Sequence, residues 1–427
     1  MLQSNQETTS SGPAPSVSRY RCRSCDAPLV HTFVDLGTSP LCQRHVTPAR
    51  FDHAEPIYPL HAYVCDKCWL VQLPAYVARE EVFDGEYAYF SSYSDSWLDH
   101  CRRYVDQMTT QLSLSSGSRV VELASNDGYL LQYFVKKGIP VLGVEPTANT
   151  AAAAREKGVN SLVKFFGRET AREVARDFGP ADLILGNNVL AHVPDINDFV
   201  AGIKLALKPH TGTVTIEFPH LVELMKHNQF DTIYHEHFSY LSFTAVRTIF
   251  ARHGMTLFDV ERLPTHGGSI RIYAKHDDDV RPISPRVEAM LKDERDFGIT
   301  TLSAYASFAE QVRETKRKLL AFLIEAKRQG KRIVGYGAPG KGNTLLNYCG
   351  IRTDFIDYTV DRNPHKQTNF LPGSRIPIHA PERILQDKPD YVLILPWNLR
   401  KEISEQMKAI RAWGGKFVVP IPSVEVF

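Results

Sequence analysis

Two pairs of cysteines near the start of the chain constrain its fold more than any other feature. CRSC (22–25) and CDKC (65–68) each place two thiols on one tight turn, and 39 residues separate the pairs. Four thiolates brought together form the tetrahedral set that Zn²⁺ prefers, at about 2.3 Å per bond, and leave no open position for catalysis. Four unrelated thiols are the alternative. We expect structural zinc on Cys22, Cys25, Cys65 and Cys68, with the residues between the pairs folded as a lobe.

Composition narrows the class of protein. The chain has 427 residues, 43% of them hydrophobic and 23% charged, as in soluble globular proteins of two or three domains. The net charge of +2 gives no basic field for nucleic acid, and no apolar run approaches the roughly 20 residues that cross a bilayer. The first nineteen residues are polar and lack the apolar core of a secretory signal. We expect a cytoplasmic monomer that binds neither nucleic acid nor membrane, with residues 1–19 as a disordered tail.

The middle of the chain alternates strand and helix patterns. An apolar strand at 120–123 meets the turn ASNDG (124–128), and an amphipathic helix follows from Tyr129. Three further apolar strands end in polar residues, namely Glu145, the pair Asn187 and Asn188, and Glu217. Strands that alternate with helices predict a doubly wound parallel α/β sheet, with its ligand at the carboxyl ends of the strands.

The first turn of this sheet indicates the ligand. It carries acids and a single glycine, whereas a dinucleotide fold would show G-x-G-x-x-G for close approach of a pyrophosphate. An acidic turn suits a cationic ligand group, and an acid that closes the second strand suits a ribose diol. S-adenosylmethionine (SAM) has both features. With the ASNDG turn, Glu145 and NNVLAHVPD (187–195), the chain resembles the class I SAM-dependent methyltransferases, although its turn departs from their commoner glycine-rich form.

That resemblance implies a set of cofactor contacts. The first motif would hold the methionine portion, the acid after the second strand would bind the ribose hydroxyls, and the FF pair at 165–166 would contact adenine. The implied SAM-binding residues are Glu122, Ala124, Asn126, Asp127, Gly128, Glu145, Pro146, Phe166 and Asn187. An acidic turn in some other α/β protein is the alternative.

A smaller Rossmann-like α/β unit follows the central sheet. An apolar stripe at helical spacing predicts a helical bridge over 286–328, and we place the domains at 20–75 (zinc lobe), 76–285 (SAM domain) and 329–427. The turn GAPGKGNTL (337–345) offers backbone amides, a helix N-terminus and Lys341, which suit a diphosphate, although the spacing is not that of a Walker A motif. A packing turn is the alternative. Candidate substrate contacts here are Lys341, Asn343 and Arg400.

The segment YHEHFSYLS (234–242) completes a second resemblance. Together with YRCRSC, YVCDKCWLVQ, EYAYFSSYS, NVLAHVPDINDF, THGGSIR and GAPGKGNTLL, it makes the chain resemble the sugar C-methyltransferases of antibiotic-producing bacteria, from about residue 20 to the end. These enzymes methylate a ring carbon of dTDP-4-keto-deoxyhexoses. The resemblance implies zinc in the first lobe, SAM in the centre and much of the nucleotide-diphosphate part of the substrate in the last lobe.

Carbon methylation explains why such a cluster is needed. A proton must leave the carbon beside the ketone, which suits a histidine base, and the resulting enolate oxygen needs hydrogen-bond donors. The resemblance implies His237 as that base, with Glu236 as its possible orienting partner and His235 as structural. Further implied active-site residues are Tyr234, Asn188 and His192, with Tyr87 and Tyr89 as lid tyrosines over the sugar.

Other functions fit parts of the pattern. The histidines of the cluster could be buried on a strand or could bind a second metal. A SAM-dependent O- or N-methyltransferase of another small metabolite would need no C–H acidification, and a non-catalytic zinc module would need no intact SAM motif. The acids of the SAM motif and the neutral charge favour the sugar C-methyltransferase.

Overall fold

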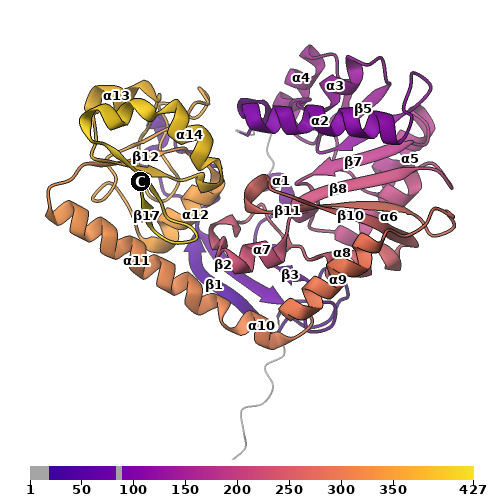
Figure 1. Ribbon diagram of the computed structural model, residues 1–427, viewed down its shortest axis with the longest axis horizontal. Coiled ribbons are helices and arrows are strands. Elements are labelled where there is room, and N and C mark those ends of the chain that lie inside the picture. Colours follow the sequence, from indigo (N-terminus) through magenta and orange to yellow (C-terminus); the bar gives the residue numbers. More distant parts are fainter. Residues whose placement is uncertain (1–18, 83–88) are drawn as a thin grey trace, which may run out of the picture.

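The computed structural model describes residues 19–82 and 89–427. It consists of a central α/β domain, a smaller C-terminal α/β lobe and an N-terminal lobe whose strands β1 and β2 lie between them (Figure 1). In the described residues, no helix is both long and apolar enough to span a membrane.

The central sheet has seven strands in the order β10-β11-β8-β7-β4-β5-β6. Five of them are parallel: β4 (Val120–Leu123), β5 (Val141–Val144), β6 (Ser161–Leu162), β7 (Leu183–Asn187) and β8 (Thr213–Pro219). The hairpin of β10 (Met255–Leu263) and β11 (Ser269–His276) adds to β8 through antiparallel β11. All residues of β4 and β5 are buried, which explains their continuous apolar pattern. The carboxyl ends of the parallel strands therefore meet at one edge, as predicted.

Helices cover both faces of this sheet. One face carries α2 (Asp95–Gln111), α3 (Leu131–Val135) and α4 (Ala148–Glu156), and the other carries α5 (Arg168–Asp177), α6 (Ile196–Ala206) and α8 (Phe243–Arg252). Two short helices, α1 (Arg79–Val82) and α7 (Leu221–Lys226), lie near the carboxyl edge of the sheet.

The N-terminal lobe contains a four-stranded antiparallel sheet. Its strands are β1 (His31–Ser39), β2 (Tyr58–Val64), β3 (Val71–Gln72) and β9 (Ser239–Tyr240). Strand β9 comes from the central part of the chain, directly after the YHEH cluster, and pairs Tyr240 with Val71 and Ser239 with Gln72. The lobe is therefore completed by the segment that carries the candidate base, and this contact between distant segments was not predicted.

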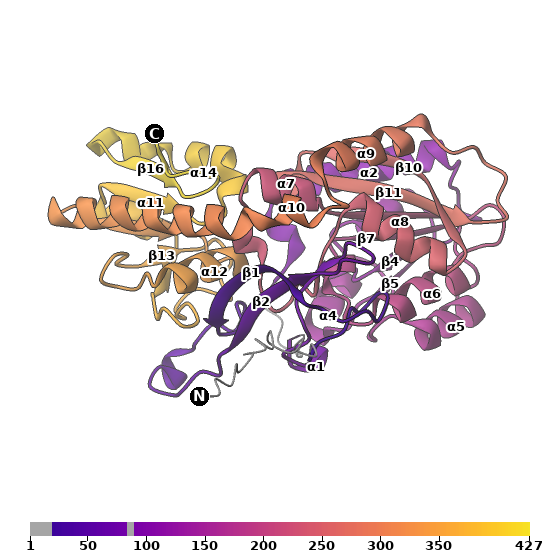
Figure 2. The same cartoon turned by 90° about the horizontal axis from the view of Figure 1, so that it is seen from below.

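Three helices connect the central domain to the C-terminal lobe, where a single helical bridge was predicted. They are α9 (Pro285–Phe297), α10 (Leu302–Ala306) and α11 (Phe308–Arg328), and Gly298 ends α9 in the left-handed conformation (φ 92°). Helix α11 runs the length of the C-terminal lobe (Figure 2). The predicted stripe of Val312, Leu319 and Leu323 is fully buried in a core shared with that lobe.

The C-terminal lobe has six strands in the order β14-β13-β12-β15-β16-β17. Strands β12 (Ile333–Tyr336), β13 (Thr359–Val360), β14 (Ile378–His379), β15 (Tyr391–Ile394) and β16 (Lys416–Val419) are parallel, and β17 (Glu425–Val426) is antiparallel. Its helices are α12 (Gly340–Cys349), α13 (Glu382–Asp387) and α14 (Arg400–Gln406). The glycine-rich turn runs directly from β12 into α12, so the strand–turn–helix order predicted from the sequence is present.

Candidate active site

A cavity of about 570 Å³ lies where the three parts of the chain meet. Gln43 lines it from the N-terminal lobe, and Pro339, Gly340 and Lys341 line it from the start of α12. The carboxyl ends of β5, β7 and β8, together with the YHEH cluster, supply much of the rest. A ligand in this cavity would therefore touch all three parts at once.

The four predicted zinc ligands converge. Their sulfur atoms all lie within 4.8 Å of one another, and the Sγ–Sγ distances are 3.5 Å for both Cys22–Cys68 and Cys25–Cys65. Each C-x-x-C turn closes on a residue in the left-handed region, Asp26 (φ 60°) after the first and Trp69 (φ 62°) after the second. A compact set of four thiols from two such turns has the donor chemistry of a structural zinc site.

Most of the predicted SAM-binding residues line one side of the cavity. These are Ala124, Asn126, Glu145, Pro146, Phe166 and Asn187. The Glu145 carboxylate accepts hydrogen bonds from the backbone N–H of Asn126 and of Thr147, both at 2.9 Å, so it ties the first turn to the second strand. Phe166 meets Phe199 edge to face, with ring centroids 5.4 Å apart. An acid beside an aromatic wall suits the ribose and adenine of SAM.

Three predicted SAM contacts lie outside the cavity lining. Glu122 is fully buried in β4, and the Asp127 carboxylate pairs with Lys157 at 2.9 Å. Gly128 has φ 73°, and a Cβ there would lie 3.2 Å from Ala154, so this glycine is required by packing and backbone conformation. The structure thus places these residues behind the turn, where they support its shape.

The side chain of Asn126 also fixes the segment after residue 88. Its Oδ1 accepts from the Ser91 N–H (2.9 Å), and its Nδ2 donates to the Tyr89 carbonyl (3.1 Å). Tyr89, one of the two predicted lid tyrosines, lines the cavity. The other predicted lid residue, Tyr87, lies outside the described residues.

His237 is held in one tautomer at the cavity wall. Its Nδ1 lies 2.7 Å from the carbonyl oxygen of Thr232, and a carbonyl only accepts, so Nδ1 carries the proton and donates it. The lone pair is then on Nε2. The rings of Tyr234 and His192 lie 4.0 Å and 4.6 Å from the His237 ring, and all three residues line the cavity.

Glu236 and His235 have other partners. Glu236 was predicted as the possible orienting partner of an imidazole, but the Thr232 carbonyl fills that position for His237, and Glu236 Oε1 instead accepts from the buried Cys42 thiol (3.5 Å). Glu236 still lines the cavity. His235 Nε2 bonds the Pro59 carbonyl at 3.0 Å in the N-terminal lobe, in accord with its predicted structural role.

The pKa of His237 determines how the activity should respond to pH. Burial, followed by the nearby His192 ring, lowers the pKa of His237 well below its usual value of about 6.5. A base must be unprotonated, so we expect kcat/KM to stay level as the pH falls through 6.5 and to decline only at lower pH. Measurement of kcat/KM between about pH 5 and 8 checks this, because an ordinary histidine would halve the rate near 6.5.

The C-terminal lobe supplies the opposite wall. Lys341 Nζ donates to Asn398 Oδ1 (2.9 Å) and lies 4.5 Å from the centre of the Trp397 ring. Trp397 in turn donates its indole N–H to Asp231 of the central domain at 2.7 Å. Lys341 and Asn398 both line the cavity, so the predicted turn faces the same space as His237.

Two other predicted substrate contacts do not line the cavity. Asn343 is buried and donates to the Cys42 carbonyl (2.6 Å), which joins α12 to the N-terminal lobe. The Arg400 guanidinium pairs with Glu425 at 2.8 Å in an exposed contact. Asn343 was predicted because it lies in the glycine-rich turn, and Arg400 because it follows the end of a strand, but the fold directs both side chains to other partners.

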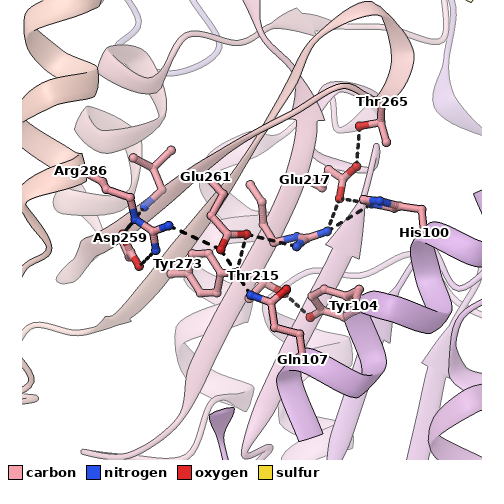
Figure 3. A network of polar contacts seen from close by, with 12 residues as sticks. His100, Tyr104, Gln107, Thr215, Glu217, Asp259, Glu261, Thr265, Tyr273 and Arg286 are labelled. Atoms are coloured by element: carbon pink, nitrogen blue, oxygen red, sulfur yellow. Dashed lines mark hydrogen bonds and ion pairs between the residues drawn. The ribbon is translucent and has the colours of Figure 1, made fainter. Parts of the chain in front are cut away.

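A network of polar contacts that the sequence analysis did not predict surrounds Glu217 (Figure 3). Glu217, at the end of β8, accepts from Arg271 (2.7 Å), His100 (2.9 Å) and Thr265 (2.8 Å). Burial raises the pKa of Glu217, but the hydrogen bond from His100 and the charge of Arg271 outweigh it and lower that pKa to about 2. His100 and Thr265 also line the cavity, so this network fixes part of its wall.

Loss of this carboxylate charge should destabilise the fold. In Glu217→Gln, Arg271, which is only 2% exposed, would lose its carboxylate partner at 2.7 Å and keep only the longer contact with Glu261 at 3.4 Å, and removing one partner of a buried ion pair costs about 3 kcal/mol. We expect that decrease in the free energy of unfolding, measured by urea titration. Asp177→Asn, which breaks the exposed pair with Arg176, is the matched control and should change stability by less than about 1 kcal/mol. Equal effects in the two variants would contradict this interpretation.

Asn188 and His266 form a further contact at the cavity. Both residues have positive φ (56° and 53°), and Asn188 Nδ2 lies 3.4 Å from His266 Nε2. Asn188 was predicted from NNVLAHVPD. His266 lies in the THGGSIR motif, and its position beside Asn188 could be found only from the fold.

Comparisons with known proteins cover nearly the whole chain. Three family models match in sequence: "Putative zinc binding domain" at 22–83, "Methyltransferase domain" at 97–260 and "C-methyltransferase C-terminal domain" at 264–422. The C-methyltransferase NovU of Streptomyces niveus is 38% identical over 408 residues, which are 95% of this chain and 96% of that protein.

More distant matches cover a smaller part of the chain. A ubiquinone biosynthesis O-methyltransferase of Rhodopseudomonas palustris is 28% identical over 116 residues, 27% of this chain and 45% of that protein. Among solved structures, magnesium protoporphyrin IX methyltransferase of Synechocystis with bound SAM matches 42% of this chain and 81% of its own, with 14% identity and a TM-score of 0.31.

Proposed function

This chain belongs to the SAM-dependent C-methyltransferases, and we propose that its acceptor is a ring carbon next to the ketone of a dTDP-4-keto-deoxyhexose. The observation that carries the proposal is the His237 tautomer. Its Nδ1–H is bonded to the Thr232 carbonyl, so Nε2 keeps the lone pair that would accept a proton from a substrate C–H in a cavity that also reaches the C-terminal lobe. Methyl transfer to oxygen or nitrogen does not require a base that removes a proton from carbon.

The chemistry follows from these positions. His237 Nε2 takes the proton from the carbon beside the ketone, and the C–H electron pair moves into a C=C bond, so negative charge develops on the ketone oxygen. Tyr234, whose ring lies 4.0 Å from that of His237, would donate a hydrogen bond to this oxygen. Glu145 and Phe166 would hold SAM, which would supply an electrophilic methyl group to the enolate carbon, with S-adenosylhomocysteine as the leaving group. His237 would keep the proton taken from carbon.

The two ends of the substrate would contact opposite walls of the cavity. The sugar would lie at His237, beside the methyl donor, and the nucleotide diphosphate would extend toward Lys341 and the N-terminus of α12. The product would be a branched deoxysugar attached to a nucleotide, and we propose that it serves deoxysugar formation in antibiotic biosynthesis.

A substrate panel tests the proposal. The purified protein would be incubated with SAM and a series of dTDP-4-keto sugars, and mass spectrometry and NMR would locate the new methyl group. We expect it on a ring carbon adjacent to the ketone. A methyl group found on oxygen or nitrogen, or no transfer to any keto sugar of the panel, would overturn the proposal.

A further inference from the structure

Five lysine and arginine side chains line the cavity, and they differ in their partners. Three are paired with carboxylates: Arg79 with Glu80 (2.7 Å), Arg103 with Asp99 (3.1 Å) and Lys164 with Glu173 (2.6 Å). The other two are Lys341 and Lys366, both in the C-terminal lobe. Within residues 19–82 and 89–427, neither forms an ion pair: Lys341 Nζ donates to the Asn398 side chain and Lys366 Nζ to the Ala338 carbonyl.

Lys366 is the more unusual of these two lysines. It is only 6% exposed, and its Nζ donates to a single described acceptor, the carbonyl oxygen of Ala338 (2.9 Å). A buried ammonium group without a counter-ion is costly, so such groups are normally paired. Because Lys366 lines the cavity, an anionic ligand there would give its Nζ a charged partner in addition to the carbonyl of Ala338.

The surroundings of Lys366 favour a phosphorylated ligand. Its Nζ bonds the residue two positions before α12, and Lys341 is the second residue of that helix. Pro339, at the N-cap, gives the helix no side-chain cap, so the first backbone N–H groups of α12 point toward the same region. A Cβ on Gly340 would lie 2.9 Å from the Cys42 sulfur, so this position admits only glycine without a shift. Two ammonium groups and a helix N-terminus match the charges of a diphosphate better than the charge of a single phosphate group.

We propose that Lys366 binds the diphosphate of the substrate jointly with Lys341, and that it sets the preference for a nucleoside diphosphate over a nucleoside monophosphate. The inference rests on the proposed function, since it concerns the nucleotide end of the same substrate. It adds Lys366, which lies well outside the glycine-rich turn in sequence, as a specificity residue.

Calorimetric titration with dTDP and dTMP tests this without any methyl transfer. We expect wild-type protein to bind dTDP more tightly than dTMP, and Lys366→Met to weaken dTDP binding about 10- to 100-fold, as for loss of a charge-assisted hydrogen bond. Binding of dTMP should change much less, so the ratio of the two affinities should fall. Lys366→Arg should retain most of that ratio.

Lys164→Met is the matched control. Lys164 also lines the cavity but already pairs with Glu173, so its loss should leave dTDP affinity within about twofold. SAM binding, measured on the same samples, reports whether the Lys366 variant remains folded. The inference is overturned if wild-type protein does not bind dTDP, or if Lys366→Met binds SAM normally and keeps the wild-type ratio of dTDP to dTMP affinity. A Lys366-dependent ratio in a protein that methylates no keto sugar would instead refute the proposed function alone.

Discussion

The His237→Asn variant is expected to lose methyl transfer to its keto-sugar substrate by about 100- to 10,000-fold, the usual contribution of a positioned general base. Asparagine can still bond the Thr232 carbonyl, but it has no group that accepts a proton from carbon. The same variant should lose solvent-deuterium exchange at the sugar carbon, measured by NMR without SAM. Exchange reports deprotonation alone, so it separates the base from any effect on methyl transfer.

Two controls make this result specific. His227→Asn changes a half-exposed histidine whose partner is Glu223, outside the cavity lining, and should leave both rates unchanged. His237→Ala should regain part of its exchange rate when free imidazole is added, because imidazole can occupy the space and supply the missing base. An undiminished exchange rate in His237→Asn would show that another group removes the proton. His192 would then be the first candidate, since its ring lies 4.6 Å from that of His237.

Local patterns in the sequence predicted the fold and the cofactors well. The class I fold, the zinc lobe and the dependence on SAM and zinc are confirmed by the matched families, the relative of nearly full length and the four-cysteine cluster. Each rested on a short-range signal, such as a C-x-x-C turn or a strand that ends in an acid like Glu145. The strand-end patterns predicted the site because the terminal residues of parallel strands lie at one common edge of the sheet.

Such short-range patterns did not predict the contacts between segments that are distant in the sequence. The acidic turn indicated a cationic ligand at Asp127, but Lys157, thirty residues later, takes that carboxylate. Arg400 adjoins the cavity-lining Asn398 in sequence, yet its partner is Glu425. Lys366 and His100 line the cavity from segments with no motif. In each case the partner is chosen by tertiary packing, which a linear pattern does not encode.

Removal of zinc should have the largest effect on stability. Zinc in four-thiolate or mixed sites contributes about 10 to 16 kcal/mol to folding in zinc-finger peptides, which equals or exceeds the whole stability of a typical domain. We expect Cys65→Ser to contain far less than one zinc per chain by mass spectrometry of the metal, to melt at a much lower temperature and to lose methyl transfer.

Loss of activity is the less obvious part of this expectation, because none of the four cysteines lines the cavity. Gln72 links the cysteine cluster to the segment that carries His237. Its Nε2 donates to the Cys22 sulfur at 3.1 Å. Gln72 lies in β3 and pairs with Ser239 of β9, two residues after His237. Loss of the metal should therefore release the strand that holds the base in place.

Cys349→Ser is the matched control, since Cys349 is also buried but lies in α12, outside the four-cysteine cluster. It should keep one zinc per chain and most of the activity. Partial chelation can then order the events: if His237 depends on the metal through β9, deuterium exchange should fall in step with zinc content while SAM binding persists longer. A zinc-depleted protein that exchanges deuterium at the full rate would show that the lobe and the base are uncoupled.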